Sequence, residues 1–332
     1  MILMKKSILM LLALVTAIAV TGCGKQKDVT VQNPVQQDGQ KEHVTQQPAD
    51  NAEDTLEKFK LLTSQAKDAG EVIQYLDSNL PKATPEQADQ LFLELEKFYD
   101  RYLPSLNDNF RAMLSKPETM QKMNEEIGYP MDINNIKDDD TLKQWLLDQQ
   151  AGGLALGNTE GEFFWKIDYK ALQKYGKYVS NDIKSYITLK VEETEQSYIS
   201  DGAIAITREE LGERILKAEY YLVENPDGLK NKDVLKIYKD YLNTYLTDYR
   251  YEAIDDKTMK LLPAVKKSYQ KFVSEHPESK TTILVKKYLE VIGKNKDVIY
   301  EKGTDSIQGP PKADIQSFWD SIDLKVDSLF VS

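Results

Sequence analysis

The chain has few of the side chains that most often carry catalysis and metal binding. Its 332 residues include one cysteine, Cys23, and two histidines, His43 and His276. Serine–histidine–aspartate and cysteine–histidine catalysis both need a histidine beside the nucleophile, and zinc sites use mainly histidine and cysteine. Walker and dinucleotide-binding glycine motifs are also lacking. We therefore expect no such nucleophile, no metal site and no cofactor.

Positive charge is also scarce. The chain has 43 basic and 54 acidic side chains, which gives a formal net charge of -11. An acidic surface is repelled by nucleic acid and by anionic lipid headgroups, so we expect no nucleic-acid partner. Only five of the basic residues are arginine, a bias that favours a low-GC Gram-positive host.

The N-terminus has the features of an export signal. Lys5 and Lys6 precede an uncharged apolar run from Ile8 to Val20. A basic segment, a short apolar segment and small residues in this order are typical of a signal peptide. The run is shorter than the roughly 20 apolar residues that a membrane helix needs. We therefore predict that residues 1–22 are cleaved.

The end of this signal, Val20-Thr21-Gly22-Cys23, resembles the lipobox of bacterial lipoproteins. The resemblance covers residues 1–23 only. It implies an S-diacylglycerol group on Cys23, with a further N-acyl group left open. Two acyl chains hold a protein firmly in a bilayer. We expect an exported protein that is lipid-anchored to the outer face of the plasma membrane.

Residues 23–53 consist of the lipidated cysteine and a polar segment that is rich in Gln, Asp, Lys, Val and Pro. The segment lacks a sustained apolar period and could not bury a core, so we interpret it as a disordered tether. A flexible chain of this length spans roughly 30 Å. The tether would hold the folded part clear of the membrane.

From residue 54 onward, apolar residues recur at helical spacing and predict an all-α fold of antiparallel hairpins or a bundle. We expect two helical regions, 54–151 and 152–332. Capping boxes at Thr84-Pro85-Glu86-Gln87 and at Thr207-Arg208-Glu209-Glu210 predict two helix starts. The first of these helices should end near Leu103-Pro104 and the second at Asn225-Pro226. Further helices are expected over 54–69, 118–127, 140–150, 170–199, 231–249, 257–275 and 280–293.

Glycines gather between Gly152 and Gly161, just before Phe163-Phe164-Trp165. This composition disfavours a helix. We expect a partly extended segment over 152–169 that divides the two helical regions.

Two proline-containing corners, Asn225-Pro226 and His276-Pro277, each end one aromatic-rich helix and precede another. The sequence from Tyr269 to Ser279 resembles the helix-turn-helix corner of tetratricopeptide repeats. The corners are 51 residues apart, whereas the repeat has a period of about 34, and the small-residue positions do not recur. The resemblance implies helical hairpins. We favour two unrelated hairpins with the same turn and keep true repeats as the alternative.

Two short motifs suggest chemistry but have simpler explanations. Ser64-Gln65-Ala66-Lys67 fits the Ser-x-x-Lys element of penicillin-recognising enzymes, but so does Ser268-Tyr269-Gln270-Lys271, and the Ser-Asp-Asn element is lacking. We interpret the match as chance. Asp138-Asp139-Asp140 lacks the spacing of a calcium-binding loop, and suits the start of the helix that follows.

Glu160 and Glu162 lie beside Phe163-Phe164-Trp165. Such a carboxylate pair could cleave glycans, with one group as acid and the other as base or nucleophile. A loop that closes over the core explains the same residues without chemistry. We favour the loop and keep an envelope glycan-acting enzyme as the alternative function.

Tyrosine is concentrated in one half of the chain, because 15 of 19 tyrosines lie from Tyr169 onward. Tyr238, Tyr241, Tyr245 and Tyr249 follow helical steps. Tyrosine buries its ring and keeps a polar hydroxyl, so the stripe suits either packing between helices or, with Trp165, a surface that binds a ligand or partner. Packing is the commoner outcome.

These observations favour a non-catalytic helical binding or scaffold module, anchored through Cys23, that binds an envelope protein or wall component. The glycan-acting enzyme is the first alternative. A further alternative is a solute-binding lipoprotein of a transporter, which ordinarily needs alternating strands and helices that the sequence does not predict.

Overall fold

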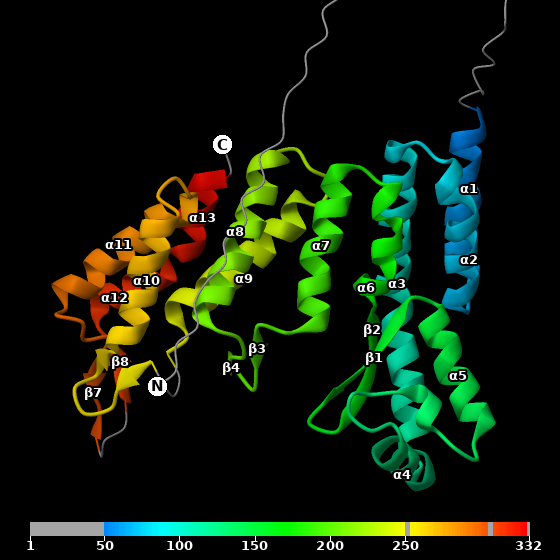
Figure 1. Cartoon of the computed structure of the whole chain (residues 1–332), viewed down its shortest axis with the longest axis horizontal. Helices are drawn as coiled ribbons and strands as arrows, with labels where there is room; N and C mark the ends of the chain where they lie inside the picture. The colour runs from blue at the N-terminus through cyan, green and yellow to red at the C-terminus, as the bar shows by residue number, and fades with distance from the viewer. Residues whose placement is uncertain (1–49, 250–252, 305–307, 331–332) are drawn as a thin grey trace, which may run out of the picture. The chain divides into compact units, whose positions relative to one another are not determined.

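The computed structural model describes residues 50–249, 253–304 and 308–330 (Figure 1). The chain divides into two units, residues 1–47 and 48–332, and all described residues belong to the second. The expected signal peptide, Cys23 and most of the expected tether lie outside the described residues. None of the described helices is long and apolar enough to cross a membrane.

Helices dominate the described residues, which confirms the all-α prediction. The α-helices are α1 (Asp50–Gln65), α2 (Ala69–Asn79), α3 (Pro85–Leu114), α4 (Pro117–Glu126), α5 (Asp140–Ala151), α6 (Tyr169–Leu172), α7 (Asn181–Glu195), α8 (Arg208–Glu224), α9 (Asn231–Thr247), α10 (Pro263–Glu275), α11 (Lys280–Lys294), α12 (Ala313–Asp320) and α13 (Ile322–Phe330).

The strands within the described residues form antiparallel pairs, each of two strands. The pairs are β1 (Leu154–Thr159) with β2 (Glu162–Ile167), β3 (Ile199–Ser200) with β4 (Ala203–Ile204), β5 (Ile254–Asp255) with β6 (Lys260–Leu261), and β7 (Tyr300–Lys302) with β8 (Gln308–Pro311). The first pair confirms the extended segment expected over 152–169. The boundary between two helical regions at this point stays a prediction.

Side-chain caps mark several helix starts. The Thr84 hydroxyl accepts from Gln87 N at 3.4 Å and the Gln87 side chain accepts from Thr84 N at 3.1 Å, so the predicted capping box is complete. Thr207 caps α8 through Glu210 N at 3.1 Å. Asp139 caps α5 through Leu142 N at 3.0 Å, so the aspartate run marks a helix start.

The prediction that the α3 helix ends near Leu103-Pro104 is wrong, because α3 continues through Pro104 to Leu114. Proline removes one backbone donor and usually bends or ends a helix. Here Leu106, Phe110 and Leu114 are buried beyond the proline. The burial of their side chains offsets the lost hydrogen bond.

The helix expected over 170–199 is also wrong as a single element. It is divided into α6, a 3-10 helix over Gln173–Lys177 and α7. Ser180 starts α7 by accepting from Ile183 N at 3.4 Å, a cap that the apolar periodicity conceals. The helix expected from residue 257 begins instead at Pro263, after the β5–β6 pair.

Carboxylates join successive helical hairpins by binding the backbone at helix starts. Asp89 of α3 accepts from Ser180 N at 2.8 Å, and Asp182 of α7 accepts from Leu229 N at 2.7 Å. Glu219 of α8 accepts from Lys280 N at 2.7 Å and Thr281 N at 2.9 Å. An acceptor on one hairpin thus satisfies the unpaired donors of the next.

The two proline corners have nearly the same backbone conformation. Asn225, which ends α8, has φ -128° and ψ 63°, and His276, which ends α10, has φ -125° and ψ 57°. Both corners join antiparallel helices, α8 to α9 and α10 to α11 (Figure 1). Their relationship to tetratricopeptide repeats stays a prediction.

Candidate functional site

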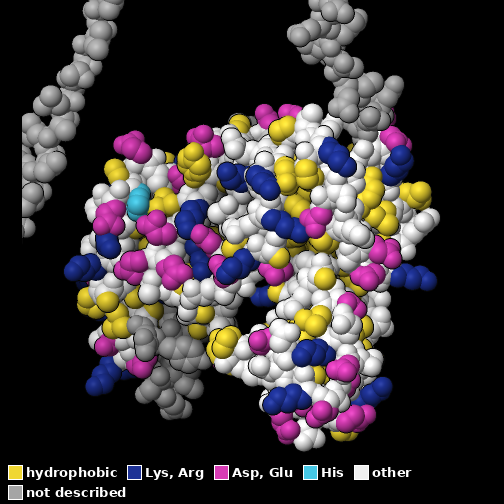
Figure 2. Space-filling model, turned by 45° about the vertical axis from the view of Figure 1, so that its right-hand side comes forward, with side chains coloured by type: hydrophobic (Ala, Val, Ile, Leu, Met, Phe, Trp, Pro, Cys, Tyr) yellow, Lys and Arg dark blue, Asp and Glu magenta, His cyan; other side chains and the backbone are white. Residues whose placement is uncertain are grey.

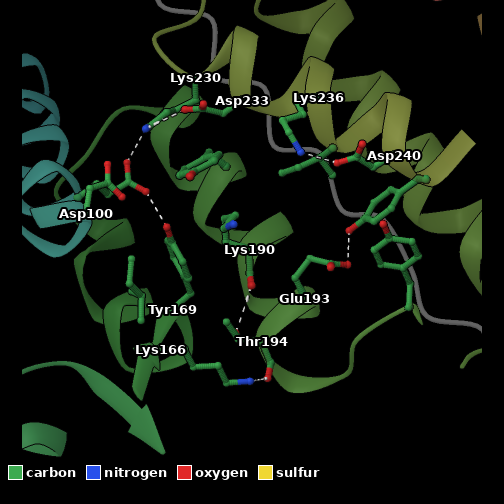
Figure 3. Close-up of a pocket in the computed structure, with 16 residues that line it drawn as sticks. Asp100, Lys166, Tyr169, Lys190, Glu193, Thr194, Lys230, Asp233, Lys236 and Asp240 are labelled. Carbon is green, nitrogen blue, oxygen red and sulfur yellow. Dashed lines mark hydrogen bonds and ion pairs between the residues drawn. The ribbon is translucent and has the colours of Figure 1, made fainter. Parts of the chain in front are cut away.

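A cavity of about 540 Å³ lies among side chains of α3, β2, α6, α7 and α9, and is called here the α7–α9 cavity (Figure 3). Its lining combines carboxylates, lysines and tyrosines with three other side chains. The residues are Glu96, Asp100, Glu193, Asp233 and Asp240; Lys166, Lys190, Lys230 and Lys236; Tyr169, Tyr186, Tyr198 and Tyr241; and Ile167, Thr194 and Ile237.

Helical spacing brings most of these groups together. Tyr186, Lys190, Glu193 and Thr194 follow steps of four, three and one along α7. Residues three and four apart share one face of a helix. A matching face of α9, from Asp233 to Tyr241, lies opposite and completes the wall.

One end of the cavity is an ion-paired cluster around Lys230. The Lys230 ammonium lies 2.6 Å from Glu96 Oε2 and 2.9 Å from Asp233 Oδ2. Burial lowers the pKa of Lys230, but the Glu96 and Asp233 carboxylates outweigh it and leave this pKa above its ordinary value. Tyr169 donates its hydroxyl proton to Glu96 Oε1 at 2.7 Å. The cluster therefore holds one ammonium group between two carboxylates.

The other end is built around Glu193. This carboxylate accepts from Arg214 Nη1 at 3.0 Å and from the Tyr241 hydroxyl. Burial, followed by the Glu193 charge, raises the pKa of Tyr241. The Tyr198 ring packs edge-on against Tyr241 at 4.9 Å between ring centres. Tyr241 thus remains a neutral donor that orients Glu193.

Lys166 donates to the backbone oxygen of Thr194 at 3.0 Å, but two other charged side chains of the cavity have no such partner. Among the described residues, neither the Lys190 ammonium nor the Asp100 carboxylate has an ion pair or hydrogen bond. Lys190 lies 5.2 Å from the centre of the Tyr169 ring, and Figure 3 shows it between Tyr169 and Glu193. The cavity can therefore offer one cation and one anion to a ligand.

The tyrosine stripe of α9 is buried. It therefore does not form an exposed binding surface, which was one of the two roles predicted for it. Tyr238, Tyr241, Tyr245 and Tyr249 are each at most 3% exposed. Tyr238 shares a hydrogen bond of 2.7 Å with Thr281, and Tyr249 bonds to tyrosine hydroxyls of α10 and α11. These contacts make the stripe a packing face of α9. Of its four side chains, Tyr241 lines the α7–α9 cavity.

Trp165 is also buried, which corrects its expected place on a binding surface. It is 2% exposed and packs against Phe110 and Trp145. The Asn107 side chain of α3 accepts from Trp165 N at 2.7 Å and donates to Trp165 O at 3.0 Å. Trp165 therefore fixes β2 on α3.

Glu160 and Glu162 are exposed at the turn between β1 and β2. Glu160 adopts φ 53°, and Glu162 makes a 3.4 Å contact with Arg111 Nε. Neither lines the α7–α9 cavity. A glycosidase acid usually lies in a buried setting, and the exposed hairpin turn does not provide one.

Reasoning from the sequence missed Lys190, Asp100 and the Lys230 cluster. Asp100 and Glu96 are in α3, whereas Lys190 is in α7 and Lys230 precedes α9. Charged residues at helical spacing usually indicate a solvated face. Only the packing of three separate helices distinguishes these side chains from the many other charges of the chain.

The visible molecular surface mixes basic and acidic side chains without a large area of one sign (Figure 2). Among the described residues, no group of three or more His, Cys, Asp or Glu side chains is placed to hold a metal ion. Comparison with protein-family models gives no matching family, and neither the curated proteins nor the solved structures include a match.

Proposed function

We propose that this protein is a non-catalytic binding module, anchored outside the cell through lipid on Cys23, that takes a short zwitterionic peptide with free ends into the α7–α9 cavity. The ligand class is inferred from Lys190 and Asp100, which have no ion pair or hydrogen bond among the described residues. The other carboxylates and cations of the cavity each have at least one. A peptide with free ends supplies both complementary charges.

The remaining lining suits the body of such a ligand. Tyr169, Tyr186, Tyr198 and Tyr241 supply aromatic walls with polar edges. Aromatic side chains of this kind bury apolar area while their hydroxyls stay paired. The cavity volume of about 540 Å³ lies within the common range for small-ligand sites, about 300–1,000 Å³. A short peptide fits this combination of charge and apolar wall.

A binding role also suits the state of the carboxylates. Glu96 and Glu193 are each held by a cation and by a tyrosine hydroxyl. Such bonds hold each carboxylate in one orientation, as fixed parts of the cavity wall.

The ligand assignment is tested by isothermal titration calorimetry with trialanine and its end-blocked forms. The protein is the full chain in a non-glycosidic detergent. Lys190→Met and Asp100→Asn should each weaken trialanine binding about tenfold, a loss of about 1.4 kcal/mol. Lys184→Met, an exposed change elsewhere on α7, is the matched control and should bind like the parent protein.

The end-blocked peptides identify which charge meets which side chain. N-acetylation should weaken binding to the parent protein but not further to Asp100→Asn, and C-amidation should behave in the same way with Lys190→Met. Equal binding of blocked and free trialanine would contradict the proposal. Equal binding of alanine and trialanine would instead favour the solute-binding alternative.

The anchor has a separate test. Cells that express the full chain are labelled with radioactive palmitate, and Cys23→Ala is compared with the unchanged protein. The changed protein should take up no label and should leave the membrane fraction, because the sulfur that carries the diacylglycerol is gone. Label on Cys23→Ala would overturn the lipobox interpretation and leave the cavity proposal intact.

A further inference from the structure

A second cavity, of about 920 Å³, lies on another part of α3, between the end of α1 and α5. It is called here the α3–α5 cavity. Tyr102, Ser105 and Asn109 line it from α3, and Trp145 and Gln149 line it from α5. It shares no lining residue with the α7–α9 cavity.

Aromatic rings form one part of the lining. Tyr102 stacks on Phe98 with 5.0 Å between ring centres and 21° between ring planes. Trp145 packs against Phe110 at 5.3 Å. Tyr102 and Trp145 are half-buried, so each ring keeps an accessible part. The face of an aromatic ring is electron-rich and attracts the weakly positive C–H groups of a sugar ring.

Neutral polar groups form the second part. Among the described residues, no hydrogen bond engages the side chains of Ser105 and Asn109 or the indole N–H of Trp145. Gln149 Oε1 accepts from the Tyr102 hydroxyl at 3.1 Å. Uncharged donors and acceptors beside aromatic rings suit a ligand that presents hydroxyl or acetamido groups next to C–H faces.

The charged groups at this cavity are balanced and largely engaged. Asp68 accepts from Gly70 N at 2.7 Å, Asp148 accepts from Gln144 Nε2 at 2.8 Å, and Arg101 lies 3.6 Å from Glu94. Lys67 is the fourth charged residue of the lining. Two cations and two anions give no net charge to select an ionic ligand.

The Ser64–Lys67 motif also lines this cavity, but its geometry does not suggest a nucleophile. Ser64 donates its hydroxyl proton to Leu61 O at 2.7 Å, a bond within its own helix. A serine nucleophile needs its proton to be directed to a base. Binding without cleavage is the role that fits this arrangement.

We propose that the α3–α5 cavity binds a neutral saccharide chain, with sugar rings stacked on Tyr102 and Trp145 and with their hydroxyl or acetamido groups bonded to Ser105 and Asn109. The cavity volume lies near the upper end of the usual range for small-ligand sites, about 300–1,000 Å³. The proposal goes beyond peptide binding at the α7–α9 cavity and rests on different residues.

The test is calorimetric titration of the full chain, in a non-glycosidic detergent, with chitotetraose, cellotetraose and maltotetraose. At least one of them should bind at millimolar concentration or below. Asn109→Ala and Tyr102→Leu should each weaken that binding about tenfold, through the lost hydrogen bond and the lost ring face respectively. The absence of binding by all three saccharides would overturn the proposal.

Matched variants separate a binding effect from a folding effect. Asn124→Ala on the exposed face of α4 should leave the affinity unchanged, and so should Lys190→Met in the other cavity. Bound saccharide should also change tryptophan fluorescence, and Trp145→Phe should lose that change while calorimetry still detects binding. Unaltered affinity in both Asn109→Ala and Tyr102→Leu would show that any saccharide binds elsewhere and would refute this site.

Discussion

The buried face of α3 is built mainly from leucine and phenylalanine, whereas tyrosine supplies half of the buried side chains of α9. Leu91, Phe92 and Leu95 are typical of α3. Tyr238, Tyr241 and Tyr245 are their counterparts on α9. Both faces are fully buried, but only the second carries a polar group on each aromatic ring.

This difference changes how neighbouring helices are joined. Buried hydroxyls need partners, and those of the C-terminal helices find them across helix boundaries. Tyr241 bonds to Glu193 of α7, and Tyr249, just after α9, bonds to Tyr269 of α10 and Tyr288 of α11. The C-terminal helices are thus held by directional bonds in addition to apolar packing.

High pH should have the largest effect on this arrangement. Burial raises the pKa of Tyr249, Tyr269 and Tyr288. Below about pH 10, the unfolded-state value for tyrosine, both folded and unfolded chains keep these protons and their full contribution is present. Above it the unfolded chain releases protons that the folded chain retains, so the free energy of unfolding falls as pH rises through the folded-state pKa.

An alkaline titration checks this expectation. Far-ultraviolet circular dichroism and tyrosinate absorbance are followed together during the titration. Helix content should be lost cooperatively above about pH 10, and ionisation of the buried tyrosines should accompany that loss. If the helices stay intact while all tyrosines ionise near pH 10, the hydroxyl network does not contribute to stability as described.

Removing the Glu219 carboxylate should have the next largest effect. This side chain accepts from Ser279 Oγ, Lys280 N, and both Thr281 N and Thr281 Oγ1, at 2.6–2.9 Å. Glu219→Ala leaves two buried donors of Thr281 and the half-buried donors of Ser279 and Lys280 without this acceptor, and should lower the free energy of unfolding by about 3 kcal/mol. Urea denaturation measures the change.

An exposed acid at the end of the same helix provides the control for Glu219. Glu224→Ala should alter the free energy of unfolding by less than about 0.5 kcal/mol. Similar losses in the two variants would mean that the bonds to α11 add little beyond general charge effects.

Tyr249→Phe should have a smaller effect, about 1–2 kcal/mol, because it removes one hydroxyl and leaves the ring packing in place. The hydroxyls of Tyr269 and Tyr288 lose a partner each. Tyr220→Phe, at a side chain 65% exposed, should be neutral within about 0.5 kcal/mol. Thermal and urea unfolding of both variants would check the difference, and equal stability would contradict the role given to the Tyr249 hydroxyl.

Local signals predicted much of the helical framework. Thr84, Thr207 and Asp139 cap helices where the sequence places them, because a cap depends on residues within one turn. Pro104, by contrast, led to the wrong prediction that α3 ends near residue 104. Proline removes a hydrogen bond locally, but the burial of Leu106, Phe110 and Leu114 against distant parts of the chain offsets that loss.

The candidate site was far less predictable. The tyrosine stripe of α9 was visible as a pattern, yet the pattern left packing and partner binding open, and burial decided for packing. Trp165 likewise belongs to the core. Lys190 and Asp100 can be recognised as candidate ligand-binding groups only in the folded protein, where α3 and α7 line one cavity.

The sequence by itself determined the helical class, the capped helix starts and the expectation of a lipid anchor on Cys23, since each depends on residues close together in the chain. Tertiary structure decided which charges neutralise one another and which aromatic rings stay accessible. Those outcomes depend on distances between residues far apart in sequence, which periodicity along one helix does not specify.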